Sequence, residues 1–420
     1  MSIAAEMSQL AGRAKTASRK LATLRSGTKN AALLAMAEGI EKAKAHLQSE
    51  NQKDVAAAEQ KGLASAMVDR LRLTDKVIAQ MAQGLREVAA LPDPVGSVSG
   101  MWVRPNGLKV GKMRIPLGVV CIVYESRPNV TVDAAGLCLK AGNSVILRGG
   151  SEAIYSNLAL AEILQKALSV SQIPSDAIQV VQTTDRQAVL ELLKLEQYVD
   201  LAIPRGGEGL IRFVAENSRV PVIKHYKGVC HTYVDKDADL EMGVKLAVNG
   251  KAQRPGVCNA TETLLIHKDV SKDFVPKVGK ALREAGVELR VCPVTAKLLG
   301  EIPHKAATED DYYAEFLDLI LAVRTVDSFD DAVAHIQKYG SDHTETIVTQ
   351  NYSTAQRFLE TVTSSCVFVN ASTRFSDGFE LGLGAEIGIS TSKIHAYGPM
   401  GLEGLTTEKF IVYGDGQARG

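Results

Sequence analysis

The chain has 420 residues, 45% of them hydrophobic and 23% charged, and its 48 basic side chains equal its 48 acidic ones. This balance leaves no positive field for a nucleic acid or an anionic membrane surface, so small molecules and identical subunits are the expected partners. A chain of this length exceeds what one hydrophobic core usually serves, which predicts two large domains with a small appendage.

The N-terminal segment carries Arg13, Lys15 and Arg19 among small residues and lacks the apolar core of a secretory signal. No stretch is apolar for long enough to cross a bilayer, and a cytoplasmic location is expected. The six cysteines form no Cys-x-x-Cys pair and no Cys/His ligand cluster along the sequence. We therefore expect neither a disulfide framework nor a metal site.

Residues 2–91 predict several amphipathic helices rich in Ala, Lys, Glu and Leu, interrupted only by scattered glycines. Prolines and glycines then punctuate residues 92–107, around Trp102-Val103-Arg104. With Leu108-Lys109-Val110 following, this pattern predicts a protruding hairpin, of the kind that often joins subunits.

After Pro116, short β-branched apolar runs alternate with helical periods, as in βαβ units around a parallel sheet. A second series of the same kind follows the helix that precedes Gly250. The fold class is therefore α/β, with two parallel-sheet domains and a small β appendage. The strand candidates are residues 118–124, 144–147, 178–181 and 199–203 in the first series, and 263–266, 317–323, 346–348 and 366–369 in the second.

Cys258 stands in the turn-forming stretch Gly250-Lys251-Ala252-Gln253-Arg254-Pro255-Gly256-Val257-Cys258-Asn259, between a predicted helix and a predicted strand. Lowering a thiol pKa from about 8.5 to about 7 requires roughly 2 kcal/mol of preferential thiolate stabilisation. Arg254, Lys251 and backbone N–H groups could supply it. The alternative is an inert buried thiol; the position in a loop favours a nucleophile.

Two strand-to-helix turns could bind phosphate groups. The strand at 199–203 runs into Pro204-Arg205-Gly206-Gly207-Glu208-Gly209, which places glycines where a helix N-terminus can meet a phosphate. No G-x-G-x-x-G fingerprint is present, and a tight turn without a ligand is the alternative. At the other turn, Arg148 with Ser151 could hold the 2′-phosphate that distinguishes NADP from NAD. Alternatively, Ser151 is a helix N-cap and Arg148 a solvated strand end.

These stretches, in this order, resemble the aldehyde dehydrogenase superfamily, and in detail its gamma-glutamyl phosphate reductase branch. The resemblance covers nearly the whole chain. It is most specific in Tyr124-Glu125-Ser126-Arg127-Pro128-Asn129-Val130, Ile203-Pro204-Arg205-Gly206-Gly207, Gln253-Arg254-Pro255 with Cys258-Asn259, residues 370–378, and Gly398-Pro399-Met400-Gly401-Leu402-Glu403-Gly404-Leu405-Thr406.

The resemblance implies the domain organisation. Residues 1–98 and 116–248 would form a nucleotide-binding domain with N-terminal helices, and residues 249–373 a catalytic domain. Residues 99–115 and about 374–420 would form an oligomerisation appendage and a site loop. The segment 374–404 holds seven glycines and little periodicity, which suits a site or an interface.

It also implies the reaction, in which L-glutamyl 5-phosphate and NADPH give L-glutamate 5-semialdehyde, NADP and phosphate. Cys258 would attack the acyl carbon and form a thioester. Asn259, Asn129 or the Cys258 backbone N–H would stabilise the oxyanion, and the residues alone do not choose among them. For the cofactor, the resemblance implies that Glu315 holds ribose hydroxyls and that Gly206 and Gly207 lie under the pyrophosphate, with Arg148 and Ser151 nearby. A solvated charge is the alternative for Glu315.

The substrate carries an α-ammonium and an α-carboxylate remote from its reacting end, and both need partners. For the ammonium we expect Glu386, inside the glycine-rich stretch 382–388, with Asp377 as second choice. Arg254 is a further expected substrate-binding residue. The alternative for Glu386 is a solvated or interface carboxylate.

Two positions depart from the family pattern. His225 lies near the place where hydrolytic aldehyde dehydrogenases carry a glutamate base, so loss of the thioester to water is not expected. Tyr397 stands where arginine is common in this branch, and no role is assigned to it. A general NADP-dependent aldehyde dehydrogenase and a non-catalytic nucleotide-binding relative are the rival functions. Because the acyl phosphate is labile in water, the glutamate kinase that makes it is a candidate partner beside a homo-oligomer.

Overall fold

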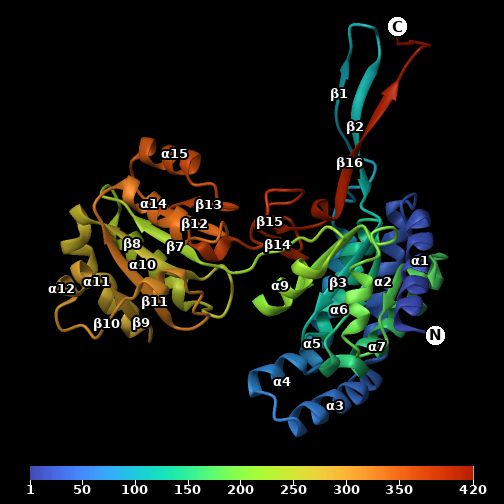
Figure 1. Cartoon of the computed structure of the whole chain (residues 1–420), viewed down its shortest axis with the longest axis horizontal. Coiled ribbons are helices and arrows are strands. Elements are labelled where there is room, and N and C mark those ends of the chain that lie inside the picture. The colour runs from blue at the N-terminus through green and yellow to red at the C-terminus, as the bar shows by residue number, and fades with distance from the viewer. Residues whose placement is uncertain (420) are drawn as a thin grey trace. The chain divides into compact units, whose positions relative to one another are not determined.

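The computed structural model describes residues 1–419. Residue 420, the end of the predicted appendage, lies outside the described residues. The chain forms two compact units (Figure 1): unit 1 comprises Met1–Lys224, Leu383–Gly388 and Met400–Gly420, and unit 2 comprises His225–Gly382 and Ile389–Pro399. The functions assigned to the predicted domains stay predictions.

Unit 1 begins with helices, as predicted. Ser2 caps the first of them by accepting a hydrogen bond from the Ala5 N–H, and Thr74 caps the fifth in the same way with Val77. Gly12, Gly39 and Gly84 lie inside helices rather than between them. The helices are α1 (Ile3–Leu21), α2 (Ser26–Lys42), α3 (Lys44–Gln60), α4 (Ser65–Leu71) and α5 (Asp75–Ala90).

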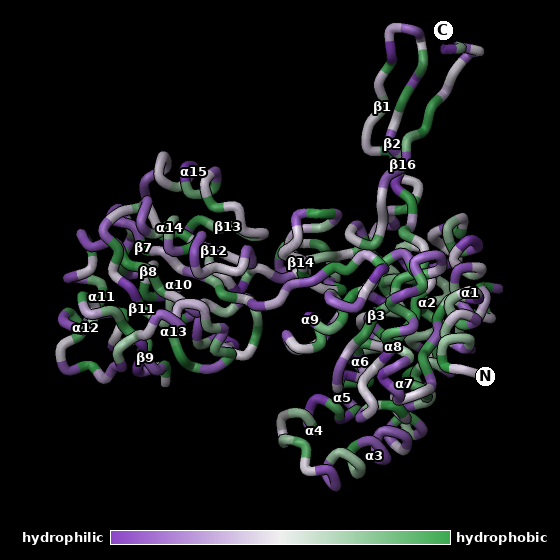
Figure 2. The backbone as a smooth tube through the Cα atoms, in the orientation of Figure 1, coloured by the Kyte–Doolittle hydropathy of each residue, from purple (hydrophilic) through white to green (hydrophobic). Residues whose placement is uncertain are grey.

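A four-stranded parallel sheet forms the core of unit 1, with strand order β5-β4-β3-β6. All six residues of β3 are buried, as an apolar run covered on both faces predicts. In Figure 2, hydrophobic segments lie among the elements of unit 1 around α2 and β3. The strands are β3 (Val119–Tyr124), β4 (Ser144–Arg148), β5 (Ile178–Val180) and β6 (Leu201–Arg205), and the helices are α6 (Pro128–Lys140), α7 (Ile154–Leu168), α8 (Gln187–Leu192) and α9 (Glu208–Asn217).

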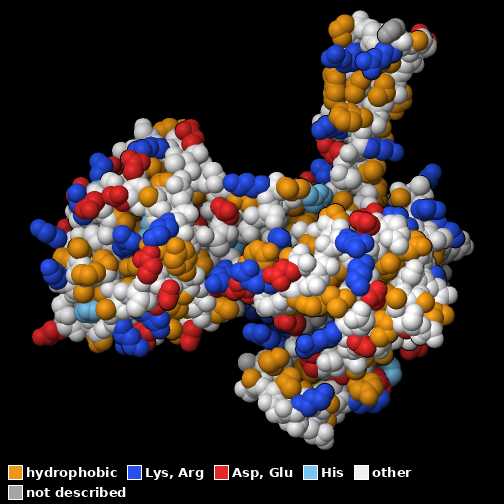
Figure 3. Space-filling view, viewed as in Figure 1, with side chains coloured by type: hydrophobic (Ala, Val, Ile, Leu, Met, Phe, Trp, Pro, Cys, Tyr) orange, Lys and Arg blue, Asp and Glu red, His pale blue; other side chains and the backbone are white. Residues whose placement is uncertain are grey.

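The predicted hairpin is present in unit 1 as β1 (Val98–Val103) and β2 (Lys109–Pro116). Near the C-terminus, β16 (Thr406–Tyr413) pairs with β2, so the appendage is a three-stranded antiparallel sheet. Every residue of β1 is exposed. Exposed hydrophobic side chains gather over this sheet (Figure 3), among them Trp102 and Phe410, whose ring centroids lie 6.5 Å apart.

Unit 2 is built on a seven-stranded parallel sheet with strand order β10-β9-β11-β8-β7-β12-β13. Four of its strands were predicted, and the run at 366–369 matches β13 residue for residue. The fold class of two parallel sheets with a small β appendage is thus confirmed. The strands are β7 (Cys230–Val234), β8 (Thr261–His267), β9 (Glu288–Val291), β10 (Lys305–Ala306), β11 (Ile320–Val326), β12 (Thr344–Val348) and β13 (Cys366–Val369).

The prediction missed β7, β9 and β10. β7 contains polar residues, yet all five of its residues are buried. The polar His231 can be buried because its Nδ1 lies 2.9 Å from Glu345 Oε2 of β12. β10 has only two residues and leaves no sequence signal. The helices of unit 2 are α10 (Leu240–Ala252), α11 (Lys268–Glu284), α12 (Pro293–Leu299), α13 (Glu309–Tyr313), α14 (Phe329–Tyr339) and α15 (Tyr352–Thr361).

The remaining strands, β14 (Gly388–Ser390) and β15 (Gly398–Met400), form a two-stranded sheet. Within residues 1–419, no helix combines the length and the apolar character needed to cross a membrane.

Candidate active site

Cys258 lies in unit 2, in the turn between the end of α10 and the start of β8, and it is half-buried. The segment before β7 packs directly against it, since a Cβ on Gly228 would overlap the Cys258 carbonyl oxygen. Cys230 donates its S–H to that same oxygen at 3.2 Å. Burial raises the pKa of Cys230 well above its usual value, so this second thiol stays protonated.

Two imidazoles lie beside the Cys258 thiol. One nitrogen of His225, one nitrogen of His343 and the Cys258 Sγ are all within 4.8 Å of one another. The two rings meet edge to face, with centroids 5.7 Å apart. Sequence reasoning identified His225 by its position but missed His343, which is far from Cys258 along the chain and carries no local motif.

The two histidines differ in their surroundings. His343 is fully buried, and its Nδ1 lies 2.8 Å from the Thr344 hydroxyl. Burial, with a smaller contribution from His225, lowers the pKa of His343 to about 3, so this ring is neutral. His225 is half-buried and donates from Nδ1 to the Ile389 carbonyl at 3.2 Å, which leaves the ring's lone pair on Nε2 in the neutral form.

A pair of guanidinium groups belongs to the same loop cluster. Burial lowers the pKa of Arg374, and the positive charge of the exposed Arg254 lowers it further, whereas Asp377 and Cys258 raise it. Arg374 Nε donates to Gln253 Oε1 at 2.8 Å. The structure therefore brings the predicted Arg254 together with Arg374. The sequence did not single out Arg374, which lies within the stretch 370–378 that resembles the family.

The Asn259 side chain holds the backbone of residues 374–376 in place. It is buried, and its Nδ2 donates to the Ser376 carbonyl at 2.9 Å and to the Arg374 carbonyl at 3.5 Å. Asp377 Oδ1 accepts the backbone N–H of Phe379 at 2.9 Å and so closes the following turn. These bonds set the path of residues 374–379 next to Cys258.

Acidic and basic groups nearby are already paired. Glu315 Oε1 accepts the Gly228 N–H at 2.9 Å and is half-buried. Lys251, expected to help stabilise the thiolate, is fully buried and bonds Glu262 Oε2 at 2.5 Å. Burial raises the pKa of Glu262 to about 7. Because its charge is opposed by that of Glu262, Lys251 adds little positive potential at Cys258.

The glycine turn of unit 1 lies between β6 and α9, and both Gly206 and Gly207 are exposed. Gly207 is the N-cap of α9, and its N–H donates to Glu125 Oε2 at 2.9 Å. A carboxylate oxygen thus occupies the place where a helix N-terminus holds an anion. A Cβ on Gly206 would lie 2.5 Å from the same oxygen, so a larger residue there would displace the Glu125 carboxylate.

The other predicted site residues of unit 1 lie outside this turn. Arg148 is nearly buried at the end of β4 and donates to the carbonyls of Gly149 at 2.9 Å and Thr184 at 3.0 Å, while its Nε lacks a hydrogen-bond partner. Ser151 is exposed and begins a short 3-10 helix. Asn129 Nδ2 donates to Asp133 Oδ2 at 3.1 Å, and Glu386 is half-buried between two buried residues.

Tyr397 has a structural contact. Its hydroxyl donates to the Thr363 carbonyl at 2.6 Å, and burial raises its pKa to about 12.

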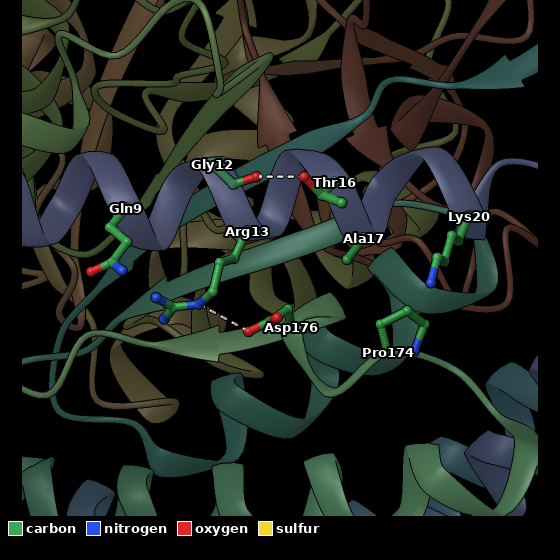
Figure 4. Close-up of a pocket in the computed structure, with 8 residues that line it drawn as sticks. All are labelled: Gln9, Gly12, Arg13, Thr16, Ala17, Lys20, Pro174 and Asp176. Atoms are coloured by element: carbon green, nitrogen blue, oxygen red, sulfur yellow. Dashed lines mark hydrogen bonds and ion pairs between the residues drawn. The ribbon is translucent and has the colours of Figure 1, made fainter.

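A surface hollow of about 380 Å³ lies elsewhere in unit 1, along α1 (Figure 4). Arg13 Nε donates to Asp176 Oδ1 across it at 3.1 Å, and Thr16 bonds the Gly12 carbonyl. None of the predicted site residues lines this hollow, so it is separate from the candidate active site.

The chain is similar to known proteins over its whole length. The model of the aldehyde dehydrogenase family matches residues 2–296. The gamma-glutamyl phosphate reductase of Geotalea daltonii is 59% identical over 419 residues, covering 100% of both chains. That of Geobacter metallireducens is also 59% identical, with the same coverage. The crystal structure of gamma-glutamyl phosphate reductase from Thermotoga maritima has a TM-score of 0.97 at 44% identity and covers 99% of this chain and 100% of that chain. The likeness therefore includes every loop described above.

Proposed function

Because the chain belongs to the aldehyde dehydrogenase family and to its gamma-glutamyl phosphate reductases, we propose that Cys258 is the nucleophile of its reaction. The enzyme reduces L-glutamyl 5-phosphate with NADPH to L-glutamate 5-semialdehyde and releases phosphate, a step of proline biosynthesis. The observation that carries the proposal for Cys258 is its half-buried thiol beside the two imidazoles and the Arg254–Arg374 pair.

In the first step, the Cys258 thiolate attacks the acyl carbon of the substrate. The bond from that carbon to the phosphate oxygen breaks, inorganic phosphate leaves, and a thioester remains on Cys258. Arg254 and Arg374 favour this step in two ways. Their positive charges stabilise the thiolate, and each guanidinium can donate two parallel hydrogen bonds to phosphate oxygens. Arg374 is the better placed of the two, because Asn259 and Gln253 fix its backbone and its Nε.

The oxyanion formed during attack needs hydrogen-bond donors. The Asn259 amide is directed to two carbonyl oxygens, which supports a positioning role for this side chain. The Cys258 backbone N–H and Asn129 remain the other candidates for the donor role. His225 stands near the place of the hydrolytic glutamate, and its Nδ1 donates to the Ile389 carbonyl.

Bound NADPH would supply the hydride that reduces the thioester to the aldehyde, with release of the Cys258 thiolate. Gly206 and Gly207 fit its pyrophosphate, because the N–H of Gly207 already binds an anionic oxygen of Glu125. Glu315 would bind ribose hydroxyls, and Arg148 with Ser151 would bind the 2′-phosphate. The unpartnered Nε of Arg148 is consistent with a further acceptor at this side chain.

For the remote end of the substrate, we assign the α-ammonium to Glu386, with Asp377 as second choice. Asp377 accepts a backbone N–H in its own turn. Glu386 is half-buried in the glycine-rich segment 382–388.

We propose a homo-oligomer that forms through the β1-β2-β16 sheet. Trp102, Phe410 and Val412 are 41%, 65% and 54% exposed, and a second copy of the chain would cover them. Sedimentation of Val412→Lys against wild type tests this: a smaller species is expected, and an unchanged one excludes this face.

A cytoplasmic location is proposed because all six cysteines are free thiols.

Association with the kinase that makes the acyl phosphate is proposed because the intermediate is labile in water. Co-sedimentation of the two enzymes checks it, and separate sedimentation at cellular concentrations would contradict it.

The reaction is tested in reverse, with glutamate semialdehyde and NADP as reactants. NADPH should form only when phosphate is supplied, since phosphate is the acceptor of the acyl group. Turnover that is equal without phosphate would indicate a hydrolytic aldehyde dehydrogenase, and no turnover under any condition would indicate a binding protein.

A further inference from the structure

The His225, Cys258 and His343 side chains offer one sulfur and two nitrogen ligand atoms, all within 4.8 Å of one another. We propose that these three residues bind a thiophilic divalent cation such as Zn²⁺, and that the ion inhibits the enzyme reversibly. Thiolate and imidazole are the ligands that Zn²⁺ prefers in proteins. Three protein ligands leave a fourth position for water.

The geometry of the cluster is close to that of a metal centre. Bonds of about 2.3 Å to sulfur and about 2.0–2.1 Å to nitrogen put tetrahedral ligand atoms roughly 3.3–3.6 Å apart. Donors that lie within 4.8 Å of one another therefore need to approach by at most about 1.5 Å. The half-buried side chains of Cys258 and His225 can make this adjustment, whereas the buried His343 is fixed.

His343 supplies the independent observation. Its side chain is 0% exposed, and its Nε2 has no hydrogen-bond partner, although a buried polar atom normally has one. Its Nδ1 is held by the Thr344 hydroxyl at 2.8 Å, as the second nitrogen of a metal-bound histidine usually is. The Ile389 carbonyl orients His225 in the same manner.

Binding exchanges a proton for the ion. The Cys258 S–H bond breaks, the proton goes to solvent, and the sulfur lone pair forms the bond to the cation, with no change of oxidation state. The inhibition rests on the proposed role of Cys258 as nucleophile, because a metal-bound sulfur cannot attack the substrate. The binding itself does not depend on that role, so the two can fail separately.

The test uses the full chain, first with Co²⁺ alone and then with Zn²⁺. Co²⁺ should bind once per chain and give a thiolate-to-cobalt charge-transfer band, which Zn²⁺ removes by displacement. Cys258→Ala should lose the band. His343→Gln should raise the Kd for Zn²⁺ at least about tenfold. His225→Gln should do the same, and it serves as the second variant if His343→Gln does not fold.

The matched control is His335→Gln, which removes another buried imidazole of unit 2 whose Nε2 is also unpartnered. It should bind Zn²⁺ as wild type does. In the activity assay, Zn²⁺ should inhibit wild type and this control equally, and a chelator should restore both. The metal site is refuted if Cys258→Ala keeps the charge-transfer band, or if His343→Gln and His225→Gln both bind Zn²⁺ like wild type. Binding without inhibition would instead contradict the role of Cys258.

Discussion

Two loops of the molecule are suited to anions, and they are built in different ways. The turn between β6 and α9 uses neighbours in sequence: a strand end, two glycines and a helix N-terminus. The loop of Cys258 acquires its surroundings from distant segments, namely His225, His343 and Arg374. A site made of backbone groups can therefore be found from local sequence, whereas a site made of side chains requires the fold.

The two loops also differ in solvation. Gly206 and Gly207 are exposed, and the Gly207 N–H donates to the Glu125 carboxylate. Around Cys258, burial lowers the pKa of His343 and Arg374 and raises that of Glu262. Charges interact more strongly where water is excluded, so side-chain changes near Cys258 should have larger effects than changes at the turn.

The largest effect is expected at the thiol itself. Cys258→Ser and Cys258→Ala should lower kcat by at least about a thousandfold, because a hydroxyl without a strong base is a poor nucleophile. NADPH binding and the denaturation midpoint should stay near wild type. Cys292→Ser, which alters another half-buried thiol of unit 2, is the control and should keep its activity. Comparable turnover in either Cys258 variant would refute the mechanism.

Glu386 tests whether unit 1 contributes to substrate recognition as well as to cofactor binding. A charge-assisted hydrogen bond contributes about 1.5–3 kcal/mol, so Glu386→Gln should lower kcat/KM for glutamate semialdehyde roughly ten- to more than a hundredfold. The loss should be smaller for an N-acetylated analogue, which lacks the α-ammonium. Reverse-direction kinetics with both substrates measure this, and equal losses would remove Glu386 from the substrate site.

The exposed turn is probed by a change that the unliganded fold should tolerate. A Cβ on Gly207 meets no atom within 4 Å, so Gly207→Ala should leave the denaturation midpoint unchanged. If the pyrophosphate lies over this residue, the methyl group should raise the Kd for NADPH about tenfold, or about 1.4 kcal/mol. Gly209→Ala, also in open space on α9, is the matched control for NADPH binding. Identical Kd values for the two variants would place the pyrophosphate elsewhere.

The smallest effect concerns stability and not catalysis. Burial lowers the pKa of His335 to about 2, from 6.5 in the unfolded chain. The folded state therefore resists protonation, and stability present above pH 6.5 is lost as the pH falls toward the folded pKa. At pH 5.5 the loss is about 1.4 kcal/mol for one such histidine.

His335→Gln should remove that part of the pH dependence between pH 7.5 and 5.5, measured by guanidinium denaturation at each pH. His46→Gln, at an exposed position, is the control and should leave the dependence as in wild type. A pH dependence that is the same in both variants would show that His335 is solvated.

The sequence predicted the parts of the fold that depend on short patterns. The runs of Val and Ile in β3 and β4, the hairpin of β1 and β2, and the family resemblance are confirmed. β7 was missed because its buried His231 is satisfied by Glu345, a partner more than a hundred residues away. His343 was not predicted as a site residue for the same reason. Its neighbours in sequence form no motif, and only the fold brings it to Cys258.

The central claim is that Cys258 carries the acyl group until phosphate removes it. Its most direct test is a rapid-mixing experiment with enzyme, NADP and glutamate semialdehyde in the absence of phosphate. We expect a burst of NADPH that approaches one equivalent per Cys258, followed by near arrest, and steady turnover once phosphate is added. Steady turnover without phosphate, or the same burst from Cys258→Ala, would contradict it.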